Sequence, residues 1–423
     1  MDLTSILYNA IAVMVIIGGI MTAAAYLVLL ERWTAAWVQM RRGPNRVGVP
    51  LTKIRLFGLG QPLADGLKFI FKEEYTPAHV NKRLYLLAPF VMTVSALAVY
   101  AVIPFGSGLP INLSEVPLIN LLPLASWGWD GPREIPLLLA GGLDVGLIYV
   151  FALSSIAVYG VILGGWASND KYSFLGALRS SAQIIAYELP LGLGILGVVL
   201  ASGTLRLDRI VVAQAETGLW NVVCQPLGCL VFVIAAFAEA ARLPFDLPEA
   251  EQELIGGYHT EYSGIKLLLF LTSEFIHMIT ASFLIVILFL GGWHLPFGLT
   301  GSVGMESAEM GTGGEIGLGL GLWRIGVLLI KVLLVVFFFM LVRWSWPRFR
   351  FDQLMALAWK VMLPLGLANL VAMACLFEAQ EQGWIGTPGR VLAGWVVAAV
   401  SLLVMALAGP RLSDNRPRLQ PVE

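Results

Sequence analysis

Charged residues are scarce in this sequence: Asp, Glu, Lys and Arg make up only 13% of its 423 residues. A soluble domain usually contains about 25%. Hydrophobic residues make up 58% of the chain, and the mean hydropathy is +0.80. The formal net charge of −1 gives no reason to expect a nucleic-acid partner. The composition therefore indicates an integral membrane protein.

Cysteine and histidine are also scarce. The three cysteines, Cys224, Cys229 and Cys375, cannot supply the four ligands that an iron–sulfur cluster needs. The four histidines never form a facing pair in two spans, which disfavours a haem between helices. The dinucleotide-binding pattern G-x-G-x-x-G occurs at 192–197, but no strand precedes it, so we interpret its glycines as helix-packing positions. We therefore expect no bound redox cofactor; partner subunits would hold the electron carriers.

Long apolar runs are abundant. A helix needs about 20 residues to cross the hydrocarbon core, and only helices or closed barrels satisfy all backbone polar groups in lipid. Nine runs have about this length, so we predict an all-α polytopic membrane protein with about nine transmembrane helices. The expected spans are 5–30, 84–104, 143–165, 181–201, 221–240, 265–291, 321–342, 360–377 and 389–409.

The basic residues are distributed unevenly between the two sides of the expected membrane. If the amino terminus lies outside, 21 of the 27 Lys and Arg residues fall in inward loops, ten of them in residues 31–83. Loops on the cytoplasmic side carry such an excess. We therefore predict that the amino terminus lies outside and the carboxyl terminus inside.

Four ionisable residues interrupt the expected spans: Glu188, Glu239, Glu274 and Lys331. Such groups are unfavourable in hydrocarbon and usually face a cavity or a partner. For each one alone, a pairing that only serves packing is an equally good explanation. Because four different spans carry one, we favour a functional set of groups.

Acidic residues are concentrated in one short segment, 237–262, which contains six carboxylates and a single arginine, Arg242. If a helix begins at Pro248, Glu249 and Glu253 lie one turn apart. Burial and mutual repulsion are expected to raise the pKa values of these carboxylates. Leu, Phe and Ile residues lie between the acids, which favours a segment tucked against the membrane over a solvated loop. We interpret it as part of a path of protonatable carboxylates.

The first inward loop, 31–83, contains an amphipathic segment with the sequence QPLADGLKFIFKEE. In a helix, Leu63, Leu67 and Ile70 share one face, and Asp65 and Lys68 lie on the other. This pattern is typical of a helix in the plane of the membrane interface. The pattern alone fits a lipid-surface anchor and the wall of a site for a lipid-soluble substrate equally well.

Five segments carry a resemblance to a known family. In chain order they are RRGPNRVG, QPLADGLKFIFKE, WASNDKYSFLGALRSSAQIIAYE, AEAARLPFDLPEAEQELIGGYHTEY and PRFRFDQLMALAWKVMLP. They resemble the H subunit of bacterial respiratory complex I, called subunit 1 in mitochondria. The match is collinear from about residue 5 to residue 378.

The resemblance implies a membrane subunit of a proton-pumping NADH:quinone oxidoreductase in the bacterial cytoplasmic (inner) membrane. Its inward loops would form the mouth and lower wall of a quinone chamber. NADH, flavin and iron–sulfur clusters would be held by other subunits. The partners would be the peripheral-arm subunits at the quinone site and the antiporter-like membrane subunits, with a quinone (ubiquinone or menaquinone) as substrate.

The resemblance also implies two sets of site residues. The quinone set is Glu31, Arg32, Arg41, Asp65, Arg242, Phe275, Arg343, Arg348 and Arg350. The proton-path set is Glu188, Glu239, Asp246, Glu249, Glu251, Glu253, Glu261 and Glu274, to which we add Lys331 as a charge within a span.

The family core is expected at residues 1–378, followed by an extra transmembrane helix and a basic tail at 379–423. The sequence departs from the family at a few positions. Ala241 stands where the family usually has Asn, and Phe275 replaces a frequent Tyr, so no hydroxyl donor is present there.

Three other functions fit parts of the sequence. The first is the homologous subunit of a membrane-bound hydrogenase or deazaflavin-dependent dehydrogenase, against which the many arginines of the quinone set argue. The second is a free-standing cation/proton antiporter, against which we find no inverted repeat with paired broken helices. The third is a simple membrane anchor, which the charges within the spans disfavour.

Overall fold

The computed structural model describes residues 3–48, 57–106, 137–141, 143–246, 255–296 and 318–408, and within these ranges the regular structure is entirely helical. This confirms the predicted all-α class. The α-helices are α1 (Leu3–Val38), α2 (Gln61–Phe71), α3 (Lys82–Ala98), α5 (Gly146–Ala167), α6 (Lys171–Ser202), α7 (Leu207–Thr217), α8 (Asn221–Cys224), α9 (Pro226–Glu239), α11 (Gly264–Phe289), α13 (Leu318–Ser345), α14 (Phe351–Ala356), α15 (Leu363–Glu381) and α16 (Thr387–Ala408). Short 3₁₀ or π turns occur at Val99–Ala101, Gly257–His259 and Leu357–Met362.

Eight of the described helical segments are long and apolar enough to cross a membrane. The fifth expected span, 221–240, contains two shorter helices, α8 and the 14-residue α9. The break falls at Gln225, because the following Pro226 disfavours the helical conformation in the residue before it. A helix of 14 residues is about 21 Å long, which is shorter than the hydrocarbon core.

The helices extend beyond the apolar runs that predicted them. The first run ends near residue 30, but α1 continues through Glu31 and Arg32 to Val38. The eighth run begins at 360, whereas the helical segment Phe351–Glu381 is continuous. Hydropathy finds the part of a helix that lies in lipid. The helix itself continues further, and α1 ends just before Met40, whose φ of +55° is left-handed.

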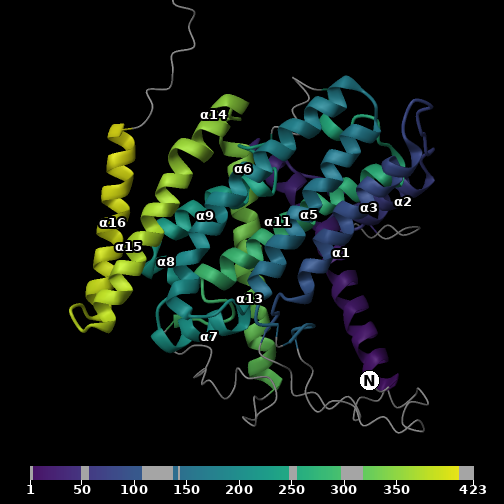
Figure 1. Ribbon diagram of the computed structural model, residues 1–423. Helices are drawn as coiled ribbons and strands as arrows, with labels where there is room; N and C mark the ends of the chain where they lie inside the picture. Colours follow the sequence, from purple (N-terminus) through teal and green to yellow (C-terminus); the bar gives the residue numbers. More distant parts are fainter. Residues whose placement is uncertain are drawn as a thin grey trace, which may run out of the picture.

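The helices form a bundle with two distinct ends (Figure 1). Helices α2 and α14 lie at one end, which we name the α2 end, and α7 lies at the opposite end, which we name the α7 end. The beginning of α1 lies towards the α7 end, and α16 finishes at the α2 end. The described chain therefore begins and finishes at opposite ends of the bundle.

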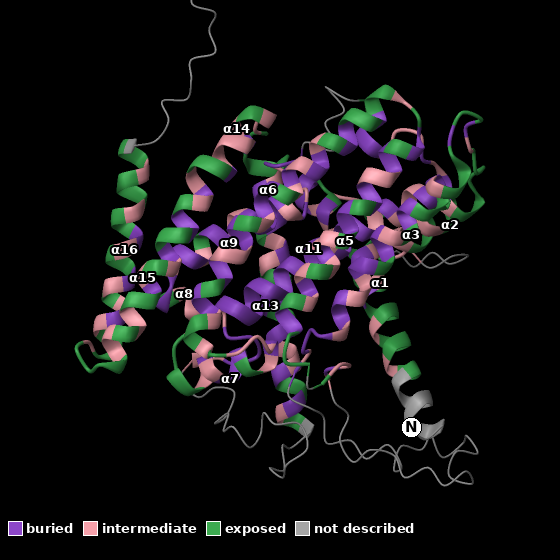
Figure 2. Cartoon of the chain, in the orientation of Figure 1, coloured by how far each residue is buried: buried purple, intermediate pink, exposed green. Residues whose placement is uncertain are grey.

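Helix α11 occupies the centre of the bundle. It contacts α1, α3, α9 and α13, and 83% of the residues in its most apolar 18-residue stretch are buried. Residues 10–19 of α1 and the outer face of α16 are mostly exposed, so burial decreases from the centre towards both sides (Figure 2). Small residues allow close packing elsewhere: a Cβ at Gly160 would lie 2.8 Å from Met92, and one at Gly194 would lie 3.1 Å from the Gly228 carbonyl oxygen. Gly194 belongs to the 192–197 pattern, whose predicted packing role is confirmed at Gly194 and at Gly197, where a Cβ would lie 2.6 Å from Gln225 Oε1; at Gly192 it is wrong, because a Cβ there would have no atom within 4 Å.

Candidate functional site

A cavity of about 490 Å³ opens near the α2 end, between α1, α11 and the end of α13. We name it the arginine cavity. It brings together six residues of the expected quinone set: Glu31, Arg32, Arg41, Arg242, Phe275 and Arg343. Val28, Ala35, Ala36 and Leu271 supply apolar wall beside these charges.

Glu31 connects two arginines inside this cavity. Its carboxylate lies 3.6 Å from Arg242 Nη1 and accepts a hydrogen bond from Arg343 Nη1. The Arg242 guanidinium also lies over the Phe275 ring, 4.2 Å from its centroid. These contacts join α1, α11, α13 and the segment after α9. Because Glu31 and Arg242 are buried, the ion pairs are shielded from solvent and hold the wall of the cavity in a defined geometry.

Helix α2 is attached to this wall by its polar face. Arg32 on α1 makes an ion pair with Asp65 on α2 at 2.7 Å, and Gln61 Nε2 donates to the same carboxylate at 3.0 Å. The amphipathic segment is therefore confirmed as a helix. Its Asp65 contacts α1, whereas Lys68 and the apolar residues Leu63 and Ile70 are exposed.

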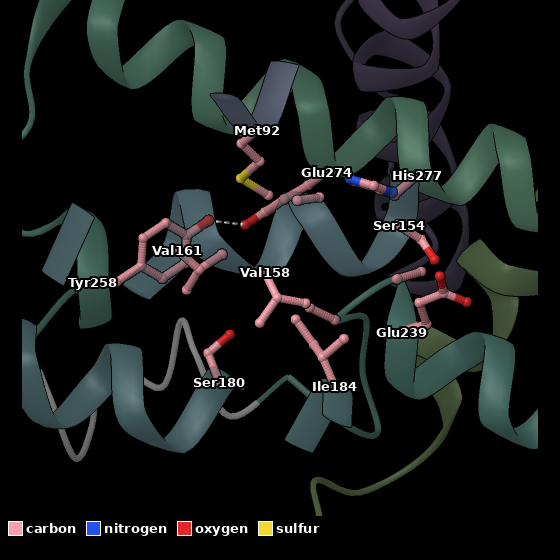
Figure 3. Close-up of a pocket in the computed structure, with 13 residues that line it drawn as sticks. Met92, Ser154, Val158, Val161, Ser180, Ile184, Glu239, Tyr258, Glu274 and His277 are labelled. Atoms are coloured by element: carbon pink, nitrogen blue, oxygen red, sulfur yellow. Dashed lines mark hydrogen bonds between the residues drawn. The ribbon is translucent and has the colours of Figure 1, made fainter. Parts of the chain in front are cut away.

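A second, smaller cavity lies between α3, α5, α6, α9 and α11 (Figure 3). We name it the carboxylate cavity because Glu239 and Glu274 line it, together with Tyr258 and His277. Its volume is about 30 Å³, which is enough for water. The remaining lining is mostly aliphatic, so water in it would bond mainly to the two carboxylates and their polar neighbours.

Each carboxylate near this cavity has a hydroxyl group beside it. Tyr258 donates to Glu274 at 2.7 Å (Figure 3). On the other side, Ser155 donates to Glu188 at 2.9 Å, and the adjacent Ser154, which donates to the Phe151 carbonyl oxygen at 3.0 Å, lines the cavity beside Glu239. Consecutive serines of α5 thus lie beside a carboxylate from α6 and one from α9. The spatial order is Glu188, Glu239, cavity and Glu274.

Glu274 lines both the arginine cavity and the carboxylate cavity. It is the only residue common to the two linings among the described residues. The two expected sets of residues therefore meet at one side chain near the middle of α11.

The other expected residues lie around these cavities. Arg348 makes an ion pair with Asp246 at 3.3 Å, and Arg350 caps the start of α14. The main-chain oxygen of Glu261 accepts a hydrogen bond from Tyr85. Glu249, Glu251 and Glu253 lie outside the described residues. Among the described ranges, no group of three His, Cys, Asp or Glu residues is arranged to hold a metal ion.

Lys331 lies apart from both cavities. Its ammonium contacts the loop that follows α11 at the α7 end. Glu274 and Leu290 are 16 residues apart, so Lys331 and Glu274 are separated by about 24 Å along α11.

Sequence reasoning did not identify Ser154, Ser155 or Tyr258. The Ser154–Ser155 dipeptide is the polar interruption of an otherwise apolar α5 span, and that signal was available. Tyr258 gives no such signal, because it reaches Glu274 only through the packing of its turn, Gly257–His259, against α5 and α6.

These features define the class of protein. The chain is an all-helical, multi-pass membrane protein in which buried carboxylates lie between helices, beside a larger cavity lined by arginines.

The family model described as NADH dehydrogenase matches residues 11–374, so the chain belongs to this family. It is 42% identical over 387 residues to the H subunit of NADH-quinone oxidoreductase from Leptospira biflexa, covering 91% of this chain and 99% of that relative. It is 41% identical over 373 residues to NADH-quinone oxidoreductase subunit 8 of Rhodothermus marinus, covering 87% and 96%. An H subunit of NADH-quinone oxidoreductase from Geobacter metallireducens is 45% identical over 352 residues, covering 83% and 91%.

Proposed function

We propose that this chain is the H-type membrane subunit of a proton-pumping NADH:quinone oxidoreductase. It forms part of the quinone chamber and couples quinone reduction to proton movement through its buried carboxylates. The observation that carries the proposal is that Glu274 lines both the arginine cavity and the carboxylate cavity. The names of the relatives support the reaction.

The arginine cavity suits a quinone. Its volume of about 490 Å³ is within the range of about 300–1,000 Å³ that is usual for small-molecule sites. A quinone head group has two carbonyl acceptors on a flat apolar ring. Arginine donors and the Phe275 ring offer matching contacts, and the apolar residues of the wall suit the rest of the molecule. Asp65, Arg348 and Arg350 support this site from outside its lining.

The carboxylates next to this cavity provide the coupling. When a quinone gains electrons, negative charge appears near Glu274 and makes proton uptake by a nearby group more favourable. Water in the carboxylate cavity connects Glu274 to Glu239, and the adjacent α5 serines lie beside Glu239 and Glu188. A change of three pKa units corresponds to about 4 kcal/mol, while moving one charge across 100 mV takes about 2.3 kcal/mol. The free energy from such a pKa change is therefore large enough to move one charge across the membrane.

We extend the path to Asp246, Glu249, Glu251, Glu253 and Glu261 as the acidic segment that follows α9. Lys331 is not included, because it lies about 24 Å from Glu274 along α11. The partners are the peripheral-arm subunits at the quinone site and the antiporter-like membrane subunits.

In this proposal the chain crosses the bacterial cytoplasmic membrane nine times, with α9 as the short fifth crossing. An odd number of crossings agrees with a chain that begins and finishes at opposite ends of the bundle (Figure 1). The α2 end, where the basic loops gather, is the inner side. Residues 1–378 form the functional core, and α16 with the tail that follows it is an addition at its edge.

The test is Glu274→Gln in the assembled complex, because glutamine keeps the shape and removes the titrating proton. We expect NADH oxidation by ferricyanide to stay normal, while NADH:quinone activity and the proton-to-electron ratio in proteoliposomes fall at least tenfold. Glu274→Asp should be milder. The matched control is Glu381→Gln on the exposed end of α15. Wild-type proton translocation in the Glu274→Gln complex would refute the proposal.

A further inference from the structure

Lys331 occupies a site built from main-chain oxygens. Its Nζ atom donates to the carbonyl oxygens of Leu290, Gly292 and His294 at 2.7, 2.9 and 2.7 Å. An ammonium has three N–H donors, so each donor has one acceptor. The side chain is 8% exposed. Within the described ranges it makes no ion pair with a carboxylate.

Two further features stabilise a positive charge at this position. The ammonium lies 4.6 Å from the centroid of the Trp220 ring, which is a cation–π geometry. It also lies beyond the carboxyl end of α11, where the helix dipole is negative. A lysine that would be unfavourable in hydrocarbon thereby has an acceptor for each of its N–H donors, with no carboxylate partner among the described residues.

The loop after α11 is shaped to aim its carbonyl oxygens inwards. Gly291 and Gly292 have positive φ values of +72° and +54°, which other residues adopt at a penalty. A Cβ at Gly291 would lie 2.8 Å from Trp220, and one at Gly292 would lie 2.7 Å from Val211. The site therefore ties together α13, the end of α11 and the segment from α7 to α8.

Other polar groups face the same loop. His294 is buried, and desolvation lowers its pKa, with the nearby charges of Lys331 and Arg324 lowering it further. The group beside the ammonium is therefore a neutral imidazole. Towards the α2 end, residues Phe283–Phe289 of α11 are all buried and apolar.

We propose that the carbonyl oxygens of residues 290, 292 and 294, with the Trp220 ring, form a binding site for a small monovalent cation of the ammonium class, permanently filled by Lys331. The tethered cation holds the α7 end of the bundle closed and does not carry protons. Loss of one proton would turn the nitrogen lone pair towards one of the three carbonyl oxygens and leave that oxygen without a donor. The site depends only on this geometry and holds whichever reaction the complex catalyses.

The experiment compares Lys331→Met and Lys331→Ala with wild type in the purified complex. Methionine keeps the length of the side chain and leaves the carbonyl oxygens without donors, whereas alanine empties the site. We expect both to lower the midpoint of thermal unfolding by several degrees. Methylammonium chloride should restore at least half of the loss in Lys331→Ala, while choline chloride at equal ionic strength, which is too bulky, should not. Neither salt should rescue Lys331→Met.

A wild-type midpoint in Lys331→Met, with lost proton translocation, would overturn the proposal in favour of a proton carrier. Failure of methylammonium to stabilise Lys331→Ala would equally overturn it. If the Lys331→Ala complex does not assemble, the cells are grown with either methylammonium or choline. Only the cells grown with methylammonium should then yield assembled complex. In the resting wild-type complex, an amine-reactive reagent should modify the exposed Lys171 and Lys360 but not Lys331. Equal modification of all three would also contradict the site.

Discussion

Glu274, near the middle of α11, and Lys331, beside the α7 end of the same helix, are both ionisable groups within the apolar bundle, yet their surroundings differ. Glu274 accepts a hydrogen bond from Tyr258 and faces two cavities with room for water or a ligand. Lys331 uses each of its three donors on a main-chain oxygen.

The difference concerns what a buried charge can do. A carboxylate beside a space that can hold water can gain or lose a proton, because the water can hydrogen-bond to either form of the group. An ammonium enclosed by three acceptors is held in one state by the same contacts that fix its position. Burial alone therefore does not distinguish a proton carrier from a structural charge; the free space next to it does.

The largest effect is expected from Glu31→Ala, which breaks the wall next to Glu274. The change leaves Arg242 and Arg343 without the carboxylate between them. Removing one partner of a buried pair usually lowers stability by about 3–5 kcal/mol. Thermal unfolding of the complex should show a lower midpoint, and Glu381→Ala, on an exposed surface, should not. An unchanged midpoint for Glu31→Ala would mean that the ion pairs do not support the cavity.

A smaller effect is expected from Tyr258→Phe, which removes the hydroxyl that bonds Glu274. A hydrogen bond to a charged group contributes about 1.5–3 kcal/mol, so proton-coupled quinone reduction should fall by about 10- to 100-fold. Electron transfer from NADH to ferricyanide should be unaffected. Tyr159→Phe on the exposed face of α5 serves as the control. If both variants behave alike, the Tyr258 bond has no part in coupling.

The other end of α11 provides a pH test. Because the pKa of His294 is lowered in the folded state, the unfolded state binds more protons as the pH falls through about 6.5. The contribution of His294 to the free energy of unfolding should therefore be fully present above that pH. It should decrease below that pH by at most about 1.4 kcal/mol per pH unit.

Thermal unfolding midpoints measured from pH 7.5 to 5 check this expectation. His294→Asn should flatten the decline, whereas His79→Asn, at an exposed position, should leave it as in wild type. An equal slope in all three proteins would show that His294 titrates as an ordinary exposed histidine.

The smallest effect is expected from Ala241, which lines the carboxylate cavity with a φ of +48°. A residue with a Cβ is strained in this left-handed region, and Asn or Gly adopts it more readily. Ala241→Gly should raise stability by about 1 kcal/mol, and Ala241→Asn should do the same. Differential scanning calorimetry of the complex is the measurement. A lower midpoint in both variants would show that the Ala241 side chain contributes packing that outweighs the strain.

The sequence by itself determined the all-helical class and the approximate positions of the long spans, because a bilayer requires apolar helices of a certain length. It also indicated that Glu188, Glu239, Glu274 and Lys331 are special, because charge within a span is unfavourable. It did not reveal that the helix after Gln225 is short, since hydropathy does not register the break at Pro226.

Only the tertiary structure decided which of these charges lie together. Glu188 and Glu239 are 51 residues apart in the chain, and they lie beside two adjacent serines on a third helix. Lys331 was included in the proton-path set as a charge within a span, and the structure places its ammonium at the α7 end, where the turn at Gly291 and Gly292 presents its oxygens. The rotation and depth of each helix are set by side-chain packing between segments far apart in the chain, and periodicity within one segment carries no information about them.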